Sequence, residues 1–110
     1  MITSDSIRGY NDTIILSLLA NGDSYGYELS KQIREGTKEA YSIKETTMYS
    51  AFTRLEKAGY ITSYPGDITH GKKRTYYAIT KLGRAFLNEK ELEWQTTKKV
   101  VDYFLKGEIK

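Results

Sequence analysis

The sequence predicts a mainly α-helical fold with one small β-hairpin, on the basis of three observations. Apolar-rich segments at 14–20, 25–34 and 46–58 are bounded by residues that favour helix ends. Two runs rich in aromatic and β-branched residues, 60–64 and 74–79, flank a stretch of turn-forming residues that extends from Pro65 and Gly66 to Gly71, Lys72 and Lys73. A long helical pattern follows. This order of three helices, a hairpin and a long helix is that of a winged helix-turn-helix domain with an added dimerisation helix.

The first three helices carry start signals. Asn11 and Asp12 provide an N-cap region for the first helix. Gly26 lies in the first turn of the second helix, where glycine lowers helix propensity, and close approach of a neighbouring helix would explain its presence. Ser42 and Glu45 have the spacing of a capping box, so the third helix is expected to begin as early as residue 43.

The last helix is expected to extend beyond the core. Thr80 can cap a helix that runs from Lys81 to about Lys106. Such a helix is too long to lie against so small a core, and its apolar positions need a partner, for which a second copy of the chain is the simplest. We therefore expect a winged helix-turn-helix domain at 1–80 and a dimerisation helix at 81–110, together forming one compact unit.

Positive charge is concentrated in the middle of the chain. The net charge is +3, but residues 42–84 carry eight basic and three acidic side chains, a local net charge of +5. Part of this charge lies on Lys72 and Lys73, beside Gly71 at the expected hairpin tip. A basic wing next to a helix-turn-helix is typical of proteins that bind double-stranded DNA.

Composition excludes several other classes of function. The chain has no cysteine and one histidine, which excludes disulfides, thiolate zinc sites and a histidine metal cluster. It contains no Gly-rich phosphate loop and no G-x-S-x-G motif, so we expect neither an enzyme nor a cofactor. No apolar run approaches the roughly 20 residues of a membrane span, and the start resembles no export signal, so we expect a cytoplasmic protein.

Three strings occur in order along the chain: YGYEL at 25–29, TMYSAFTRLEKAGYI at 47–61 and GKKRTYYAITKLG at 71–83. Followed by a helix that carries Trp94, they resemble the PadR family of transcriptional regulators. The resemblance implies a homodimeric winged-helix repressor that binds a palindromic operator. In short, multidrug-responsive members, paired tryptophans of the last helix hold planar aromatic compounds at the dimer interface, and Trp94 is similar to that tryptophan.

One position departs from the family pattern. The family often has Ser-Pro just before the recognition helix, where this chain has Lys44 and Glu45. A carboxylate at this place repels phosphate unless it takes part in the helix cap, whereas Lys44 adds a phosphate ligand.

The candidate DNA-binding residues lie on the third helix and the wing. On the helix they are the polar residues away from the core-facing positions, together with Lys44: Thr46, Thr47, Tyr49, Ser50, Thr53 and Arg54. On the wing they are Lys72, Lys73 and Arg74. The alternative in both places is a solvated surface, and Tyr49 fits core packing as well as DNA contact.

The remaining aromatic residues have simpler interpretations. Trp94 fits either dimer packing or the wall of a pocket for a planar aromatic effector. Tyr25, Tyr27, Tyr60 and Tyr77 are interpreted as structural. The leading functional hypothesis is therefore a dimeric DNA-binding regulator with an effector, and the alternative is a winged-helix module that binds another protein.

Overall fold

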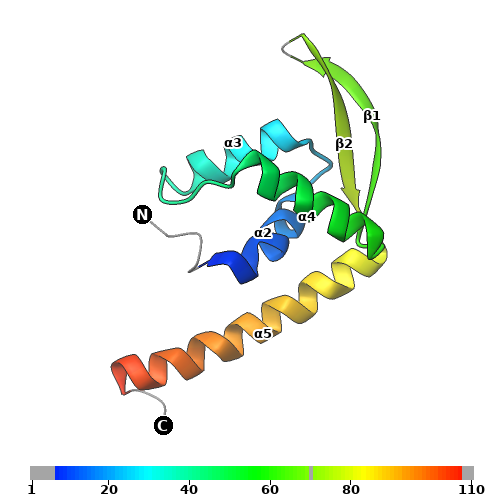
Figure 1. Cartoon of the computed structure of the whole chain (residues 1–110). Coiled ribbons are helices and arrows are strands. Elements are labelled where there is room, and N and C mark those ends of the chain that lie inside the picture. Colours follow the sequence, from blue (N-terminus) through cyan, green and yellow to red (C-terminus); the bar gives the residue numbers. More distant parts are fainter. Residues whose placement is uncertain (1–6, 70, 108–110) are drawn as a thin grey trace.

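The computed structural model describes residues 7–69 and 71–107 (Figure 1). A short 3-10 helix, η1 (Arg8–Tyr10), leads into α2 (Asn11–Leu19), which is followed by α3 (Gly26–Gly36) and α4 (Glu45–Lys57). Strands β1 (Ile61–Thr69) and β2 (Lys72–Ile79) form an antiparallel hairpin, and α5 (Lys81–Lys106) follows it. The predicted mainly helical fold with a hairpin wing is confirmed.

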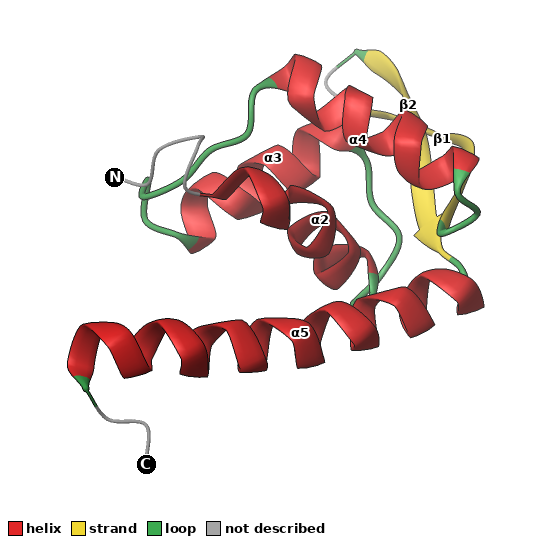
Figure 2. Cartoon of the chain, turned by 60° about the horizontal axis from the view of Figure 1, so that its bottom comes forward, coloured by secondary structure: helices red, strands yellow, loops and turns green. Residues whose placement is uncertain are grey.

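The core lies where α2, α3, α4 and the base of the hairpin meet. In both views α2 lies between α5 and the pair of helices α3 and α4 (Figures 1 and 2). Among the described residues, the buried apolar side chains are Ile15, Leu16, Leu19, Leu29, Ile33, Tyr41, Ile43, Met48, Ala51, Phe52, Leu55, Ile61 and Tyr77. Each helix contributes at spacings of three and four, because one face of each is apolar.

The start of α2 differs from the expected one. Asn11 is the first residue of the helix rather than its cap, and the cap position is Tyr10, which makes no side-chain cap bond. The Asn11 side chain is buried and accepts a hydrogen bond from the Tyr41 hydroxyl. A buried amide needs a partner inside the protein, so Asn11 serves tertiary structure instead of capping.

The start of α4 also differs, and the expected capping box is wrong. The helix begins at Glu45, with Lys44 in extended conformation at the cap position and no side-chain cap bond. Ile43 is buried in the core, which holds the chain extended up to Lys44. Ser42 therefore stands two residues too early to reach the free amides of the first turn.

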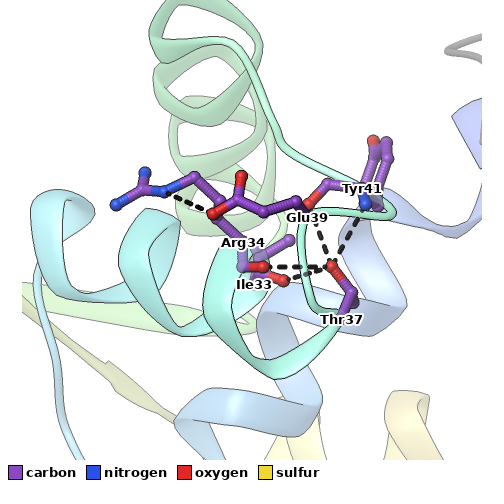
Figure 3. A network of polar contacts seen from close by, with 5 residues as sticks. All are labelled: Ile33, Arg34, Thr37, Glu39 and Tyr41. Carbon is purple, nitrogen blue, oxygen red and sulfur yellow. Dashed lines mark hydrogen bonds and ion pairs between the residues drawn. The ribbon is translucent and has the colours of Figure 1, made fainter. Parts of the chain in front are cut away.

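A polar network closes the turn between α3 and α4 (Figure 3). The Thr37 hydroxyl donates to the Ile33 carbonyl at 2.8 Å and accepts from the Tyr41 amide at 3.1 Å. Arg34 and Glu39 form an ion pair across the same turn at 3.8 Å. These bonds fix the path of the chain between the two helices and thereby help to set the position of α4.

The hairpin strands are longer than the sequence indicated. Pro65 and Gly66 were expected in the turn, but they lie inside β1, and Lys72 and Lys73 lie inside β2. The register shifts between Pro65 and Ile68, so the expected turn formers produce an irregularity in a continuous hairpin. The irregular region still separates the inner part of the wing from its tip.

The last helix has the expected bounds, and its cap is confirmed. The Thr80 hydroxyl accepts a hydrogen bond from the Gly83 amide at 3.0 Å. Gly83 is buried, and a Cβ there would lie 2.1 Å from the Tyr60 carbonyl oxygen, so only glycine lets α5 approach the hairpin base this closely. Phe86 stacks on Tyr60 one turn later, with ring centroids 4.3 Å apart.

Leu87 also packs against the core, and beyond it the helix leaves the core. Its exposed apolar side chains are Leu92, Trp94, Val100, Val101, Tyr103, Phe104 and Leu105. None of the helices within the described ranges combines the length and the apolar character needed to cross a membrane.

Candidate nucleic-acid interface

The outer face of α4 is polar along its length. Met48, Ala51, Phe52 and Leu55 are buried, and they occupy one side of the helix. The predicted contact residues on the other side are all exposed: Thr46, Thr47, Tyr49, Ser50, Thr53 and Arg54. A helix with this division has its full apolar face satisfied within the chain and presents hydrogen-bonding groups outward.

Tyr49 packs with one edge of its ring and stays partly exposed. Its ring edge packs on Phe52, with centroids 5.7 Å apart, while 47% of the residue stays exposed. A Cβ on Gly26 would lie 3.1 Å from the Tyr49 hydroxyl oxygen, so the close helix approach expected at Gly26 is confirmed. The hydroxyl thus lies at the junction of α3 and α4.

The N-terminal end of α4 carries opposite charges on adjacent residues. Lys44 and Glu45 are both exposed at the cap and first helical positions. An acidic group here interacts favourably with the helix dipole but disfavours a nearby phosphate. Lys44 is the cation at this end that can bind a phosphate.

Arg54 is already paired within the chain. Its Nε and Nη2 atoms donate to the two carboxylate oxygens of Asp12 on α2, with the Nε–Oδ2 distance 3.3 Å. This hydrogen bonding raises the pKa of Arg54 above its ordinary value. A DNA phosphate that binds Arg54 has to share or replace this carboxylate.

The three predicted cations of the wing differ in their exposure. Lys72 and Lys73 are exposed on β2 beside the tip. Arg74 is only partly exposed, because its guanidinium lies over the Tyr25 and Tyr27 rings at 5.2 and 5.3 Å from their centroids. The two lysines are thus exposed, whereas the arginine packs against the body of the protein.

A groove joins α4 to the wing. It has a volume of about 490 Å³ and is lined by Gly26, Tyr27, Ser30, Ile43, Glu45, Met48, Tyr49, Lys72 and Arg74. It therefore brings together predicted residues of both elements, Tyr49 from the helix and Lys72 and Arg74 from the wing. It also contains two residues of α3: Ser30, which the sequence did not single out, and Tyr27, which was interpreted as structural.

Trp94 lines a second, apolar groove away from this surface. The groove has a volume of about 390 Å³ and is lined by Ile7, Tyr10, Thr13, Ile14, Ser17, Leu87, Glu91 and Trp94. Trp94 meets the Tyr10 ring edge to face, with centroids 5.1 Å apart. The predicted effector residue on α5 therefore lines a groove between α2 and α5, together with seven residues that sequence reasoning did not assign to an effector site.

The sequence matches a family model described as the transcriptional regulator PadR-like family over residues 15–89. The match spans α3, α4, the wing and the first turns of α5. The chain belongs to the PadR-like family. Membership in this family, which the three sequence strings indicated, is confirmed, and it is a family of transcriptional regulators rather than of enzymes.

Known structures agree with the fold of this PadR-like chain. A transcriptional regulator from Clostridium thermocellum is 62% identical, with a TM-score of 0.87 over 94% of this chain and 98% of that one. A PadR family transcription regulator from Clostridium difficile R20291 is 42% identical, with a TM-score of 0.76 over 87% and 98% of the two chains. An uncharacterized protein from Lysinibacillus sphaericus is 48% identical over 97% of this chain and 98% of its own length.

The residues of the Trp94 groove in this PadR-like chain were missed for one reason. Tyr10, Ile14 and Ser17 recur at spacings of three and four along η1 and α2, as do Leu87, Glu91 and Trp94 along α5. Each set is visible as a helical face in the sequence. That the two faces meet around a groove depends on how α5 folds back, which no local pattern encodes.

Proposed function

We propose that the chain is a homodimeric repressor that binds a palindromic DNA operator through α4 and the wing. The observation that carries this proposal is the exposed polar face of α4 beside a wing with two exposed lysines. Family membership supports it, because the PadR-like family is one of transcriptional regulators.

The N-terminal half of α4 enters the major groove in this proposal. In a helix-turn-helix protein, residues at that end of the recognition helix reach base edges. Thr46, Thr47 and Ser50 offer hydroxyl groups for base edges, and Tyr49 and Thr53 offer further contacts to bases or phosphates. Lys44 at the helix start and Lys72 and Lys73 on the wing bind phosphates, which gives affinity without sequence preference.

The dimer forms through α5. Phe104 and Leu105 are 77% and 79% exposed, and they stand close to the exposed Val100 and Val101. An apolar surface of this kind supports association with a second copy. Residues 1–80 then act as the DNA-binding domain and 81–110 as the dimerisation helix, with two half-sites about one or two turns of DNA apart.

A planar aromatic effector occupies the groove beside Trp94. Trp94 and Tyr10 offer ring faces for stacking, and the groove is mostly apolar. Because the groove lies between α2 and α5, its occupant acts where the DNA-binding domain meets the dimerisation helix. In the dimer, the effector binds preferentially to a state in which the two recognition helices are separated differently from the DNA-bound state. This preference weakens operator binding.

The DNA test uses the duplex upstream of the chain's own coding region and a scrambled duplex of equal composition. Fluorescence polarisation at two salt concentrations is expected to show preferred, salt-steep binding of two chains per duplex. Weak, equal binding to both duplexes with a flat salt dependence would instead favour a winged-helix module that binds another protein.

The effector test uses the fluorescence of Trp94, the single tryptophan of the chain. A flat heteroaromatic compound that does not intercalate into DNA is expected to quench this fluorescence and to raise the dissociation constant of the operator complex. The substitution Gln95→Ala, at the exposed residue next to Trp94 in the sequence, is a control that is expected to leave both the quenching and the change in DNA affinity intact. Quenching without any change in DNA affinity contradicts the effector proposal.

A further inference from the structure

The wing is held by a short segment that the DNA-binding proposal does not use. We call residues 23–27, which comprise the end of the loop after α2 and the first two residues of α3, the docking segment. Ser24 exchanges two backbone hydrogen bonds with Tyr77 of β2, at 3.1 and 2.7 Å. The adjacent Asp23 carboxylate accepts a hydrogen bond from the Tyr64 hydroxyl of β1 at 2.6 Å. Both strands of the hairpin are therefore tied to the same few residues.

Aromatic packing continues this attachment toward the tip. The Tyr25 ring lies 5.1 Å from the Tyr76 ring, and Tyr76 also contacts Tyr64, at 5.8 Å between centroids. A Cβ on Gly66 would lie 1.9 Å from a Tyr76 ring atom, so the ring covers the glycine backbone of the opposite strand. The irregular part of the hairpin is thus covered by an aromatic ring.

Arg74 completes the attachment at its outer end. Its guanidinium lies over both rings of a nearly parallel pair, Tyr25 and Tyr27, whose planes differ by 11°. Its Nε donates to the Thr69 hydroxyl of β1 at 3.2 Å. One planar cation therefore joins the docking segment to both strands, which a lysine cannot do because it lacks a planar face and a fixed set of donors.

A hairpin needs such support if it is to present its tip in one direction. A two-stranded ribbon is marginally stable by itself, and here the strand register breaks between Pro65 and Ile68. Lys72 and Lys73 lie on the tip side of Arg74 in the same strand. Their position relative to α4 therefore depends on how the wing is held at Arg74.

We propose that Arg74 is a positioning residue that fixes the angle of the wing and does not itself bind DNA. In this role it orients Lys72 and Lys73 toward phosphates on the same duplex that α4 reads. The inference rests on the proposed DNA-binding function of the wing. It revises the sequence-based interpretation, in which all three cations contact DNA.

The direct test measures the orientation of the wing without DNA. Because the chain has no cysteine, spin labels can be attached at Gln32→Cys on α3 and Asp67→Cys on the wing, both exposed positions. The distance distribution between the labels is expected to be narrow in the parent and clearly broader with Arg74→Gln. Arg74→Lys keeps the charge but not the planar contact, so its distance distribution is also expected to be broader than that of the parent. Lys73→Gln, the matched control, is expected to leave the distribution narrow.

The second test is a double-mutant cycle for binding to the upstream duplex. Arg74→Gln is expected to weaken binding about tenfold in the parent and less than about twofold when Lys72→Gln and Lys73→Gln are already present. Equal losses in both backgrounds would show an independent phosphate contact and overturn the proposal, as would an unchanged label distribution in Arg74→Gln. If the parent shows no salt-steep DNA binding, the proposed function fails, while the label distances still decide whether Arg74 fixes the wing.

Discussion

The helices α4 and α5 are both amphipathic, but they use their apolar faces differently. The apolar face of α4 is satisfied within its own chain, with Met48, Phe52 and Leu55 each 2% exposed. The distal half of α5 leaves its apolar side chains in solvent, with Phe104 77% exposed. An exposed polar face suits water or a polar partner, whereas an exposed apolar face needs another apolar surface. Both helices have an amphipathic pattern, so the pattern alone does not indicate what each helix binds. The polarity of the exposed face indicates the kind of partner.

Truncating one phenylalanine on each helix tests this comparison most strongly. Phe52→Ala is expected to lower the free energy of unfolding by about 3–5 kcal/mol, because it empties a fully packed site and removes the stack on Tyr77. Phe104→Ala is expected to leave the unfolding free energy of the monomer almost unchanged and to weaken self-association instead. Urea unfolding at several protein concentrations separates the two effects. A concentration-independent loss of several kcal/mol in Phe104→Ala would contradict the comparison.

The buried start of α5 is tested at Gly83. Gly83→Ala is expected to destabilise the protein by about 1–3 kcal/mol, because the added Cβ meets the Tyr60 carbonyl oxygen in a packed interface. Gly36→Ala is the matched control, since a Cβ there meets nothing within 4 Å. That control is expected to be neutral or slightly stabilising. Thermal unfolding of both variants gives the answer, and equal effects would show that α5 does not need this close approach.

The polar surface is tested through the salt dependence of DNA binding. Lys72→Ala and Lys73→Ala are each expected to lower the slope of log Kd against log salt concentration by about 0.9, because each removes one phosphate contact. Lys99→Ala, an exposed lysine on α5, is expected to leave the slope unchanged. An unchanged slope in all three variants would show that the wing does not contact DNA phosphates.

The smallest expected effect concerns the ion pair between Asp12 and Arg54. Asp12→Asn is expected to lower the free energy of unfolding by less than about 1 kcal/mol, because exposed ion pairs contribute little in water. Arg34 and Glu39 form a second ion pair whose carboxylate is more exposed, so Glu39→Gln is the control. Urea unfolding at low and high salt measures both. A loss well above 1 kcal/mol at Asp12 alone would show that the pair is coupled to the packing of α2 on α4.

The sequence predicted the elements better than their ends and partners. Helix α5 was placed with its bounds and its Thr80 cap, because a long periodic pattern and a hydroxyl before it are local signals. The start of α4 was wrong because burial of Ile43 decides where the helix begins, and burial depends on the whole core. The turn formers Pro65 and Gly66 were assigned to a loop, although Pro65 pairs with Thr75 and β1 continues past Gly66 to resume pairing at Ile68.

The candidate site shows the same division. The exposed residues of α4 followed from its helical period, and Lys72 and Lys73 followed from their place beside a turn. The separate position of Arg74 was not visible, because its aromatic partners come from residues almost fifty positions earlier in the sequence. The pair between Arg54 and Asp12 was missed for the same reason.

Three consecutive residues at the start of α2 reach three different parts of the molecule. Tyr10 meets Trp94 of α5, Asn11 accepts from Tyr41 ahead of α4, and Asp12 pairs with Arg54. One inserted residue would turn the helix by about 100° relative to what precedes it, since a helical turn holds 3.6 residues. Residues 10–12 therefore form a stretch whose length is fixed more strictly than its composition, and we expect relatives to exchange side chains here without gaining or losing a residue.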